Sequence, residues 1–189
     1  MYIQSMKTIL KITKNELSTL FYSPIAWLIL IIFTFQSGMA YAEAWADALR
    51  SQALGYTVYG ATERLLLGWS GAISSMQEHL YLYIPLLTMG LMSQEYNRGS
   101  IKLLYSSPVT NKQIIFGKYL SMIIYALILV AILFIYYAFT AFTIKAIDTP
   151  FVMTALLGIF LMICAYAAIG LFMSSLTSYQ VVAAVGTLA

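Results

Sequence analysis

Two long runs of apolar residues, Tyr119–Phe142 and Phe151–Met173, contain no charged side chain. A third run, Pro24–Ala42, is also free of charge and follows a lysine-rich segment. An α-helix rises about 1.5 Å per residue, so each run is long enough to cross a hydrocarbon core of roughly 30 Å. Inside lipid, every backbone polar group needs a partner within the protein, and a helix supplies one. These runs therefore predict transmembrane helices.

The composition excludes an ordinary water-soluble domain. Of the 189 residues, 61% are hydrophobic and 9% are charged, and the mean hydropathy is +0.84. Soluble domains carry roughly 25% charged residues. The single cysteine, Cys164, lies inside an apolar run and supports neither a disulfide nor a thiolate metal site. We therefore predict an all-α integral membrane protein, a polytopic helical bundle with about five spans visible in this sequence.

The whole chain, residues 1–189, is predicted to form a single transmembrane domain. Its expected segments are an amphipathic interfacial helix at 6–22, a first span at 24–42, an external loop at 43–75, a second span at 76–93, a cytoplasmic connector at 94–118, a third span at 119–142, a fourth span at 151–173 and the start of a fifth span at 179–189. The last apolar run stops part-way, so we expect the sequence to be a fragment of a longer polypeptide.

The segment at 6–22 carries its lysines on one helical face and its apolar side chains on the other. This pattern is typical of a helix that lies in the membrane interface, although a flanking helix with snorkelling lysines would have the same composition. Within the connector, Thr110 and Gln113 form a capping-box pattern that predicts the start of a helix. On α-helices, the small residues Gly170 and Ser174 favour close contact with a neighbouring helix.

Lysine and arginine counts predict the orientation of the chain. The N-terminal segment and the connector hold seven of these residues, and the two alternate loops hold three. The seven are Lys7, Lys11, Lys14, Arg98, Lys102, Lys112 and Lys118, and the three are Arg50, Arg64 and Lys145. Basic residues concentrate on the cytoplasmic side of a membrane. The N-terminus and the connector are therefore expected to be cytoplasmic, and the net charge of +3 reflects orientation rather than nucleic-acid binding.

Motifs for autonomous chemistry are absent from the sequence. Gly117-Lys118 lacks the upstream glycine and the following hydroxyl of a P-loop, so no ATP site of that kind is predicted. The only histidine, His79, has no serine partner that would indicate an intramembrane hydrolase. The spans also lack the mid-membrane charges that ion-coupled transporters use. We expect no catalytic, cofactor-binding or metal-binding residue, and hence no enzyme activity of the chain itself.

Three local patterns occur in order along the chain. They are the basic N-terminal helix followed by Tyr22-Ser23-Pro24-Ile25; the run Gln94–Leu104 followed by Ser107-Pro108-Val109 and by Ile114, Gly117 and Lys118; and the run Ala168–Thr177 followed by Gln180 and Ala183. Together they resemble the permease subunits of ABC-2-type transporters, and the Ser-Pro-Ile entry and the third pattern are most similar to the gliding-motility-type branch. The resemblance implies a subunit with about six transmembrane helices in the full protein, located in the inner (plasma) membrane of the cell.

The resemblance also implies partners. They are a cytosolic ABC ATPase, a second permease subunit that is either identical or different, and the lipid bilayer. The connector between spans two and three would contain the helix that contacts the ATPase. The candidate coupling residues are Glu95, Arg98, Gly99, Ile101, Lys102, Leu104, Tyr105 and Pro108.

Within that set, Ile101, Leu104 and Tyr105 are expected to form an apolar anchor. Arg98 and Lys102 would add charged contacts, Gly99 would permit a turn after span two, and Pro108 would end the helix. The implied function is ATP-driven substrate export. The alternative is a membrane anchor for an ATPase-driven motility or secretion complex without a small-molecule cargo.

Six tyrosines allow two interpretations. They either line a substrate path at the permease–permease interface or belong to the aromatic belt of the membrane interface, which is the commoner role. They are Tyr81, Tyr83, Tyr125, Tyr136, Tyr137 and Tyr166.

Overall fold

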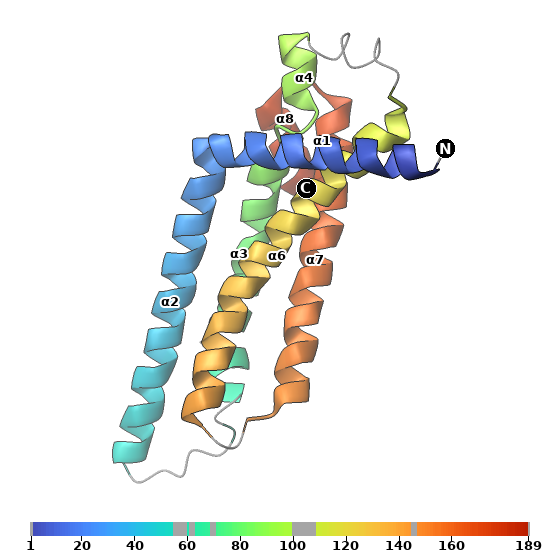
Figure 1. The fold of residues 1–189 in the computed structure, drawn as a ribbon. Coiled ribbons are helices and arrows are strands. Elements are labelled where there is room, and N and C mark those ends of the chain that lie inside the picture. The colour runs from blue at the N-terminus through green and yellow to red at the C-terminus, as the bar shows by residue number, and fades with distance from the viewer. Residues whose placement is uncertain are drawn as a thin grey trace. The chain divides into compact units, whose positions relative to one another are not determined.

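The computed structural model describes residues 2–54, 60, 63–68, 71–99, 109–144 and 147–188. The helices in this part of the chain are α1 (Tyr2–Tyr22), α2 (Pro24–Ala53), the short π-helix η1 (Glu63–Leu67), α3 (Ala72–Thr88), α4 (Ser93–Arg98), α6 (Asn111–Thr143), α7 (Thr149–Leu176) and α8 (Gln180–Leu188), and the described residues include no strand (Figure 1). The predicted all-α fold is confirmed.

Three of the described helices, α2, α6 and α7, are long and apolar enough to cross a membrane. In each, a third or less of the most apolar window is buried within the structure. Large apolar side chains such as Ile31, Phe35, Ile135 and Leu157 are exposed. Exposed apolar helix faces of this length suit contact with lipid, because a helix exposed to water would carry polar residues there. The chain is a multi-pass membrane protein.

The chain divides into two compact units. The first contains Met1–Leu28, Tyr81–Ala126 and Ile163–Ala189, and the second contains Ile29–Leu80 and Leu127–Met162. The core of the first unit includes Ala26, Ile84, Leu87, Met122, Tyr125, Ile163 and Ala167, and that of the second includes Ile29, Phe33, Leu65, Leu66, Ile73, Met76, Leu80, Leu129, Leu133, Val152, Leu156 and Ile159.

The chain turns sharply between α1 and α2 at Ser23-Pro24 (Figure 1). Pro24 occupies the first position of α2, where a missing N–H costs nothing. The Ser23 hydroxyl accepts a hydrogen bond from the Ile25 N–H at 3.3 Å, and the Trp27 indole donates to the Phe21 carbonyl at 2.8 Å. These side chains satisfy backbone groups that the two helix ends leave without helical partners.

Helix α2 continues well past the expected apolar span at 24–42. It ends at Ala53, so residues 43–53 of the expected external loop are helical. Four of the eleven residues in this extension are alanine, which has the highest helix propensity. Arg50 and Asp47 also lie 3.6 Å apart on one face of this extension. The remaining described part of the expected loop includes η1, whose Leu65 and Leu66 are buried in the second unit.

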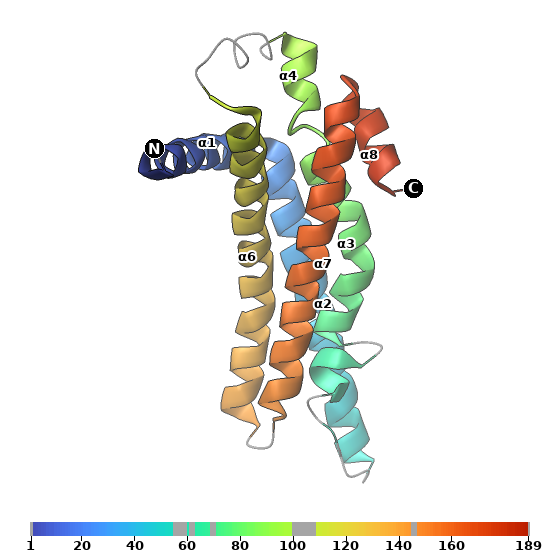
Figure 2. The same ribbon diagram turned by 90° about the vertical axis from the view of Figure 1, so that its right-hand side faces the viewer.

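Other helix bounds also differ from the expected segments. Helix α3 begins at Ala72 and ends at Thr88, whereas the second span was expected at 76–93. Helix α6 is one continuous helix from Asn111 to Thr143, so its first two turns belong to the expected connector. Helix α8 begins at Gln180 and lies beside the end of α7 (Figure 2). A Cβ atom on Gly186 would collide with Met173 Cε. Membrane crossing by α3 and α8 stays a prediction.

The tyrosines take several positions within each unit. Tyr83 and Tyr125 are buried in the first unit, and the Tyr125 hydroxyl donates to the Ala26 carbonyl at 2.8 Å. Tyr137 is buried in the second unit and donates to the Thr149 hydroxyl at 3.1 Å, whereas Tyr81 is exposed. Tyr125 and Tyr137 thus act as packing residues that join helices.

Helices α3 and α7 meet closely at Gly170 in the first unit, as its small-residue pattern predicted. A Cβ atom added to Gly170 would lie 2.7 Å from Thr88 Cβ and still closer to its hydroxyl. Gly170→Ala is therefore expected to lower the free energy of unfolding by about 2 kcal/mol, because overpacking outweighs the gain in helix propensity. Unfolding of the purified protein in detergent measures the change.

Gly158→Ala is the matched control for this prediction, because Gly158 lies in the same helix and a Cβ there would meet nothing within 4 Å. That variant is expected to be neutral or more stable by up to about 1 kcal/mol. Equal effects of the two substitutions would contradict the close contact at Gly170.

Candidate functional site

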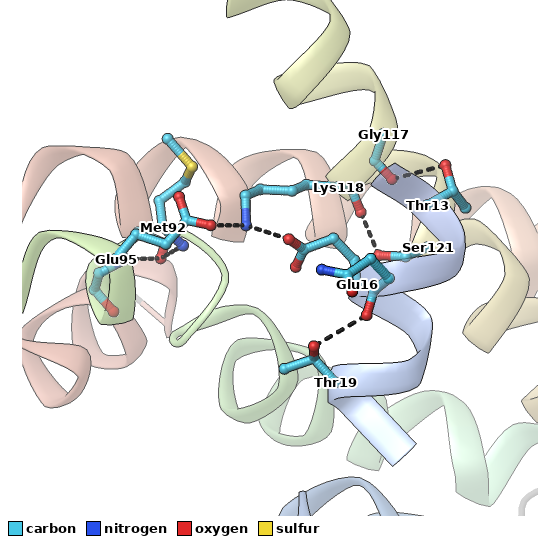
Figure 3. A network of polar contacts seen from close by, with 11 residues as sticks. Thr13, Glu16, Thr19, Met92, Glu95, Gly117, Lys118 and Ser121 are labelled. Carbon is cyan, nitrogen blue, oxygen red and sulfur yellow. Dashed lines mark hydrogen bonds and ion pairs between the residues drawn. The ribbon is translucent and has the colours of Figure 1, made fainter. Parts of the chain in front are cut away.

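Lys118, in the second turn of α6, is the most deeply buried charged residue among those described, with 2% of its side chain exposed. Its Nζ lies 2.8 Å from Glu16 Oε1 on α1 and 2.8 Å from Glu95 Oε1 on α4 (Figure 3). The two carboxylate side chains are 16% and 21% exposed. One ammonium group therefore links three helices within the first unit.

The start of α6 is fixed by a reciprocal cap. The Gln113 side chain accepts a hydrogen bond from the Thr110 N–H at 3.0 Å, and the Gln113 N–H donates to the Thr110 hydroxyl at 3.4 Å. The predicted capping box is confirmed. Because these bonds set where α6 begins, they also set the register that directs Lys118 toward α1 and α4.

Helix α1 packs directly on this end of α6. A Cβ atom on Gly117 would lie 2.6 Å from Ile12 Cγ2, so only glycine lets the two helices approach this closely. The Thr13 hydroxyl donates to the Gly117 carbonyl at 3.1 Å, and the Gln113 amide donates to the Ser5 hydroxyl at 2.9 Å. The contact runs along α1 and brings Glu16 next to Lys118.

The charges of this network do not cancel. Two carboxylates share one ammonium group, so the three side chains together carry a charge of −1 when all are ionised. Taking charges out of water is costly unless each has a close partner of opposite sign. Lys118 supplies a close positive charge to both carboxylates, so its loss would remove that charge from each of them.

A second fixed point lies at the turn between α3 and α4. The buried Ser174 hydroxyl, on α7, donates to the Met89 carbonyl at 2.9 Å. It accepts from the Met92 N–H at 3.0 Å and from the Ser93 N–H at 3.1 Å. The Ser93 hydroxyl also donates to the Met89 carbonyl. The Ser174 hydroxyl thus uses its one donor and both acceptor positions to stabilise the turn that leads into α4.

Helix α4 ends at Gly99, which has φ 71° and ψ 4°. This left-handed conformation favours glycine and suits the predicted turn at this position. The Gly99 N–H donates to the Tyr96 carbonyl at 3.2 Å. Glu95 lies one turn earlier on α4, with its side chain toward Lys118.

The predicted coupling residues are only partly brought together by these contacts. Glu95 has a partner within the chain, and Arg98 is the last residue of α4. The others, Ile101, Lys102, Leu104, Tyr105 and Pro108, lie outside the described residues. Contact of any member of the set with an ATPase stays a prediction.

Sequence reasoning missed two residues of this site. Glu16 received no role, and its only signal is that it is the single acidic residue in the lysine-rich helix α1. Lys118 was counted with the surface charges that indicate orientation, whereas its charge is paired inside the protein. Ser174 was noted for its small size, but its hydroxyl is what holds the turn into α4.

A cavity of about 70 Å³ borders this network in the first unit. Its wall includes the polar side chains of Glu16, Thr19, Gln94 and Gln180 and the backbone around Gly90. A partly polar cavity of this size has room for water. Among the described residues, no cluster of histidine, cysteine, aspartate and glutamate could hold a metal ion. The site is thus a set of links between helices, with a cavity beside Glu16.

Residues 10–189 match the protein family described as "ABC-2 family transporter protein". The chain belongs to this family, and the predicted resemblance to ABC-2-type permeases is confirmed. A stretch of 54 residues is 37% identical to "Uncharacterized protein YhcI" of Bacillus subtilis (strain 168). That match covers 29% of this chain and 17% of the relative. No solved structure matches the chain significantly. Assignment to the gliding-motility-type branch stays a prediction.

Proposed function

We propose that the chain is the membrane subunit through which a separate cytosolic ABC ATPase drives the export of a substrate. Membership of the ABC-2 family supports a permease role. The observation that carries the coupling proposal is the bridge from Lys118 to both Glu16 and Glu95. This bridge joins α4, which forms the first part of the connector, to a long membrane helix and to the amphipathic helix α1.

The proposed sequence of events begins at the connector. ATP binding would close two ATPase copies and displace the connectors that they hold. Helices α4 and α6 flank residues 100–108, so a displacement of this middle part of the connector would reach both helices. Glu95 then transmits it to α6 and α1 through Lys118, and the turn at Met89–Ser93 transmits it to α7 through Ser174.

Packed helices respond to such a displacement by moving between discrete arrangements rather than by deforming continuously. Lys118 has two carboxylate partners, so it can keep one while the distance to the other changes. The cavity beside Glu16 and Gln94 supplies room for that change. The Lys118 ammonium group would therefore keep an ion pair with at least one carboxylate while α4 moves relative to α1.

The rest of the assembly follows the family. The N-terminus and the connector would face the cytoplasm, and the protein would lie in the inner membrane. A second permease subunit, identical or different, would complete the transport path. The uneven distribution of lysine and arginine supports this orientation.

The docking proposal is tested by reversing the connector's charge with Arg98→Glu and Lys102→Glu together. Like charges placed against a partner surface cost several kcal/mol, so recovery of the ATPase with the tagged permease is expected to fall about tenfold or more. ATP-dependent transport in vesicles should fall with it. Quantitative co-purification from cells that express both proteins measures the first effect.

Lys7→Glu and Lys11→Glu together form the matched control. These lysines are exposed on α1, are predicted to lie on the same side of the membrane, and change the net charge by the same amount. The control is expected to retain ATPase recovery within about twofold. Unchanged ATPase recovery and transport in the connector variant would refute the docking role of Arg98 and Lys102.

A further inference from the structure

An apolar groove lies between the adjoining ends of α6 and α7 in the first unit. Its volume is about 280 Å³. Each helix contributes side chains from one face, at the spacing i, i+3, i+4 of successive helical turns. The lining residues are Met92, Ile115, Phe116, Tyr119, Ala168, Leu171, Phe172 and Ser175.

The groove is open along one side. Ile115, Phe116 and Phe172 are 49%, 60% and 61% exposed, so about half of each side chain meets the surroundings of the protein. Leu171 is 7% exposed and forms part of the floor. The stretch of α7 from Ala168 to Ser175 is about 10 Å long at 1.5 Å per residue. The groove is thus a shallow apolar channel parallel to two membrane helices.

Positive charge marks one end of this channel. Lys112 lies one turn before Ile115 and Phe116 on the same face of α6, and its side chain is exposed. Ser175 lies at the same end, because α6 and α7 run in opposite directions (Figure 2). Among the described residues, no carboxylate forms an ion pair with Lys112. The positive end of the α6 dipole adds to the local potential.

We propose that this groove binds an anionic phospholipid of the bilayer, with an acyl chain along the apolar channel and the phosphate headgroup at Lys112. The lining is apolar and the groove is open along one side, which suits one flexible hydrocarbon chain. The apolar lining of the groove matches the acyl chain of an anionic lipid. The positive charge of Lys112 at one end complements the negative phosphate of the headgroup. A basic residue at the membrane surface attracts anionic lipid by about 1 kcal/mol. The proposal needs only the membrane placement of α6 and α7, and it does not depend on ATPase coupling.

The first test measures lipids that remain bound to the purified full chain by native mass spectrometry, with phosphatidylglycerol and phosphatidylcholine as probes. The wild-type chain is expected to retain phosphatidylglycerol preferentially. Lys112→Gln should reduce phosphatidylglycerol binding about fivefold and leave phosphatidylcholine binding unchanged. Lys14→Gln, which removes an equal charge from an exposed position on α1, should change phosphatidylglycerol binding less than about twofold.

The second test fills the groove. Ala168→Phe places a ring in the channel, whereas Ile169→Phe places one at the neighbouring position, which is 48% exposed and does not line the groove. The first variant is expected to lose the retained phosphatidylglycerol, and the second to keep it. Light scattering of both variants checks their oligomeric state, and thermal unfolding checks their fold.

Three outcomes would overturn the proposal. One is equal phosphatidylglycerol binding by the Lys112→Gln and Lys14→Gln variants. Another is equal binding by Ala168→Phe and Ile169→Phe. The third is a change of oligomeric state in Ala168→Phe with lipid binding unchanged, which would assign the groove to a second copy of the chain. If Ala168→Phe does not fold, the comparison of Lys112→Gln with Lys14→Gln still tests the proposal. Lys112 is exposed, so its replacement disturbs no packing.

Discussion

Replacing Lys118 with methionine is expected to lower the free energy of unfolding by about 3 kcal/mol. Methionine fills a similar volume, so the loss comes from charge rather than from a cavity. Glu16 and Glu95 would be left near each other, mostly buried and without their shared cation. Removal of one partner from a buried ion pair is strongly destabilising for this reason. Denaturant or thermal unfolding of the purified protein in detergent measures the change.

The matched control is Lys112→Met, because Lys112 lies in the same helix and is exposed. It is expected to change the free energy of unfolding by less than about 0.5 kcal/mol. If Lys118→Met costs no more than this control, the three-helix link is not a stabilising contact.

A triple variant distinguishes the contribution of the network to protein stability from its proposed role in ATP-dependent transport. Glu16→Gln, Lys118→Met and Glu95→Gln together remove every charge of the network, and replacement of a whole buried ion pair by neutral groups is often tolerated. This variant is expected to recover at least half of the stability lost in Lys118→Met. Its ATP-dependent transport should stay low, because the helices have lost the charged joint. Full transport in the triple variant would show that the network serves stability alone.

The spans of α6 and α7 could be predicted because the signal is local. Each apolar run is uninterrupted by charge, and in lipid a helix satisfies all backbone hydrogen bonds within one segment. The start of α6 was also readable, since Thr110 and Gln113 stand three residues apart and their bonds are local. In both cases, the hydrogen-bonding partners are only three or four residues apart in the sequence.

The end of α2 could not be placed from hydropathy. Glu43 marks the point where the run turns polar, but helix propensity continues through the alanine-rich stretch to Ala53. Hydropathy reports the environment of a helix and not its length, so a helix that leaves the membrane appears shorter than it is. The same reason explains why residues 111–118 were assigned to the connector although they begin α6.

The Lys118 network was beyond prediction because its members are distant along the chain. Glu16 and Lys118 are separated by 102 positions, and no local pattern relates them. A lysine near the end of a span is usually a surface charge, and only the packing of Gly117 against Ile12 brings this one to Glu16. The predicted coupling residues were chosen by resemblance, which identifies the connector but not the internal partner of Glu95.

Ser174→Ala is expected to produce a loss of similar size, about 3 kcal/mol in the free energy of unfolding. The hydroxyl is buried and is the acceptor for the N–H groups of Met92 and Ser93. Each buried donor that loses its acceptor costs about 1–3 kcal/mol, and alanine offers none. Hydrogen exchange gives a local readout, because the Met92 and Ser93 amides should exchange faster in the variant.

Ser175→Ala is the matched control, because it also removes a serine hydroxyl from α7. The Ser175 hydroxyl donates to the Phe172 carbonyl within its own helix, at 2.7 Å, and holds no other segment. Its replacement is expected to change the free energy of unfolding by less than about 0.5 kcal/mol and to leave the exchange of Met92 and Ser93 unaltered. If the Ser174→Ala variant behaves like Ser175→Ala in both measurements, α7 does not hold the turn into α4. The proposed route from the connector to α7 would then lack its last step, from the turn at Met89–Ser93 to Ser174.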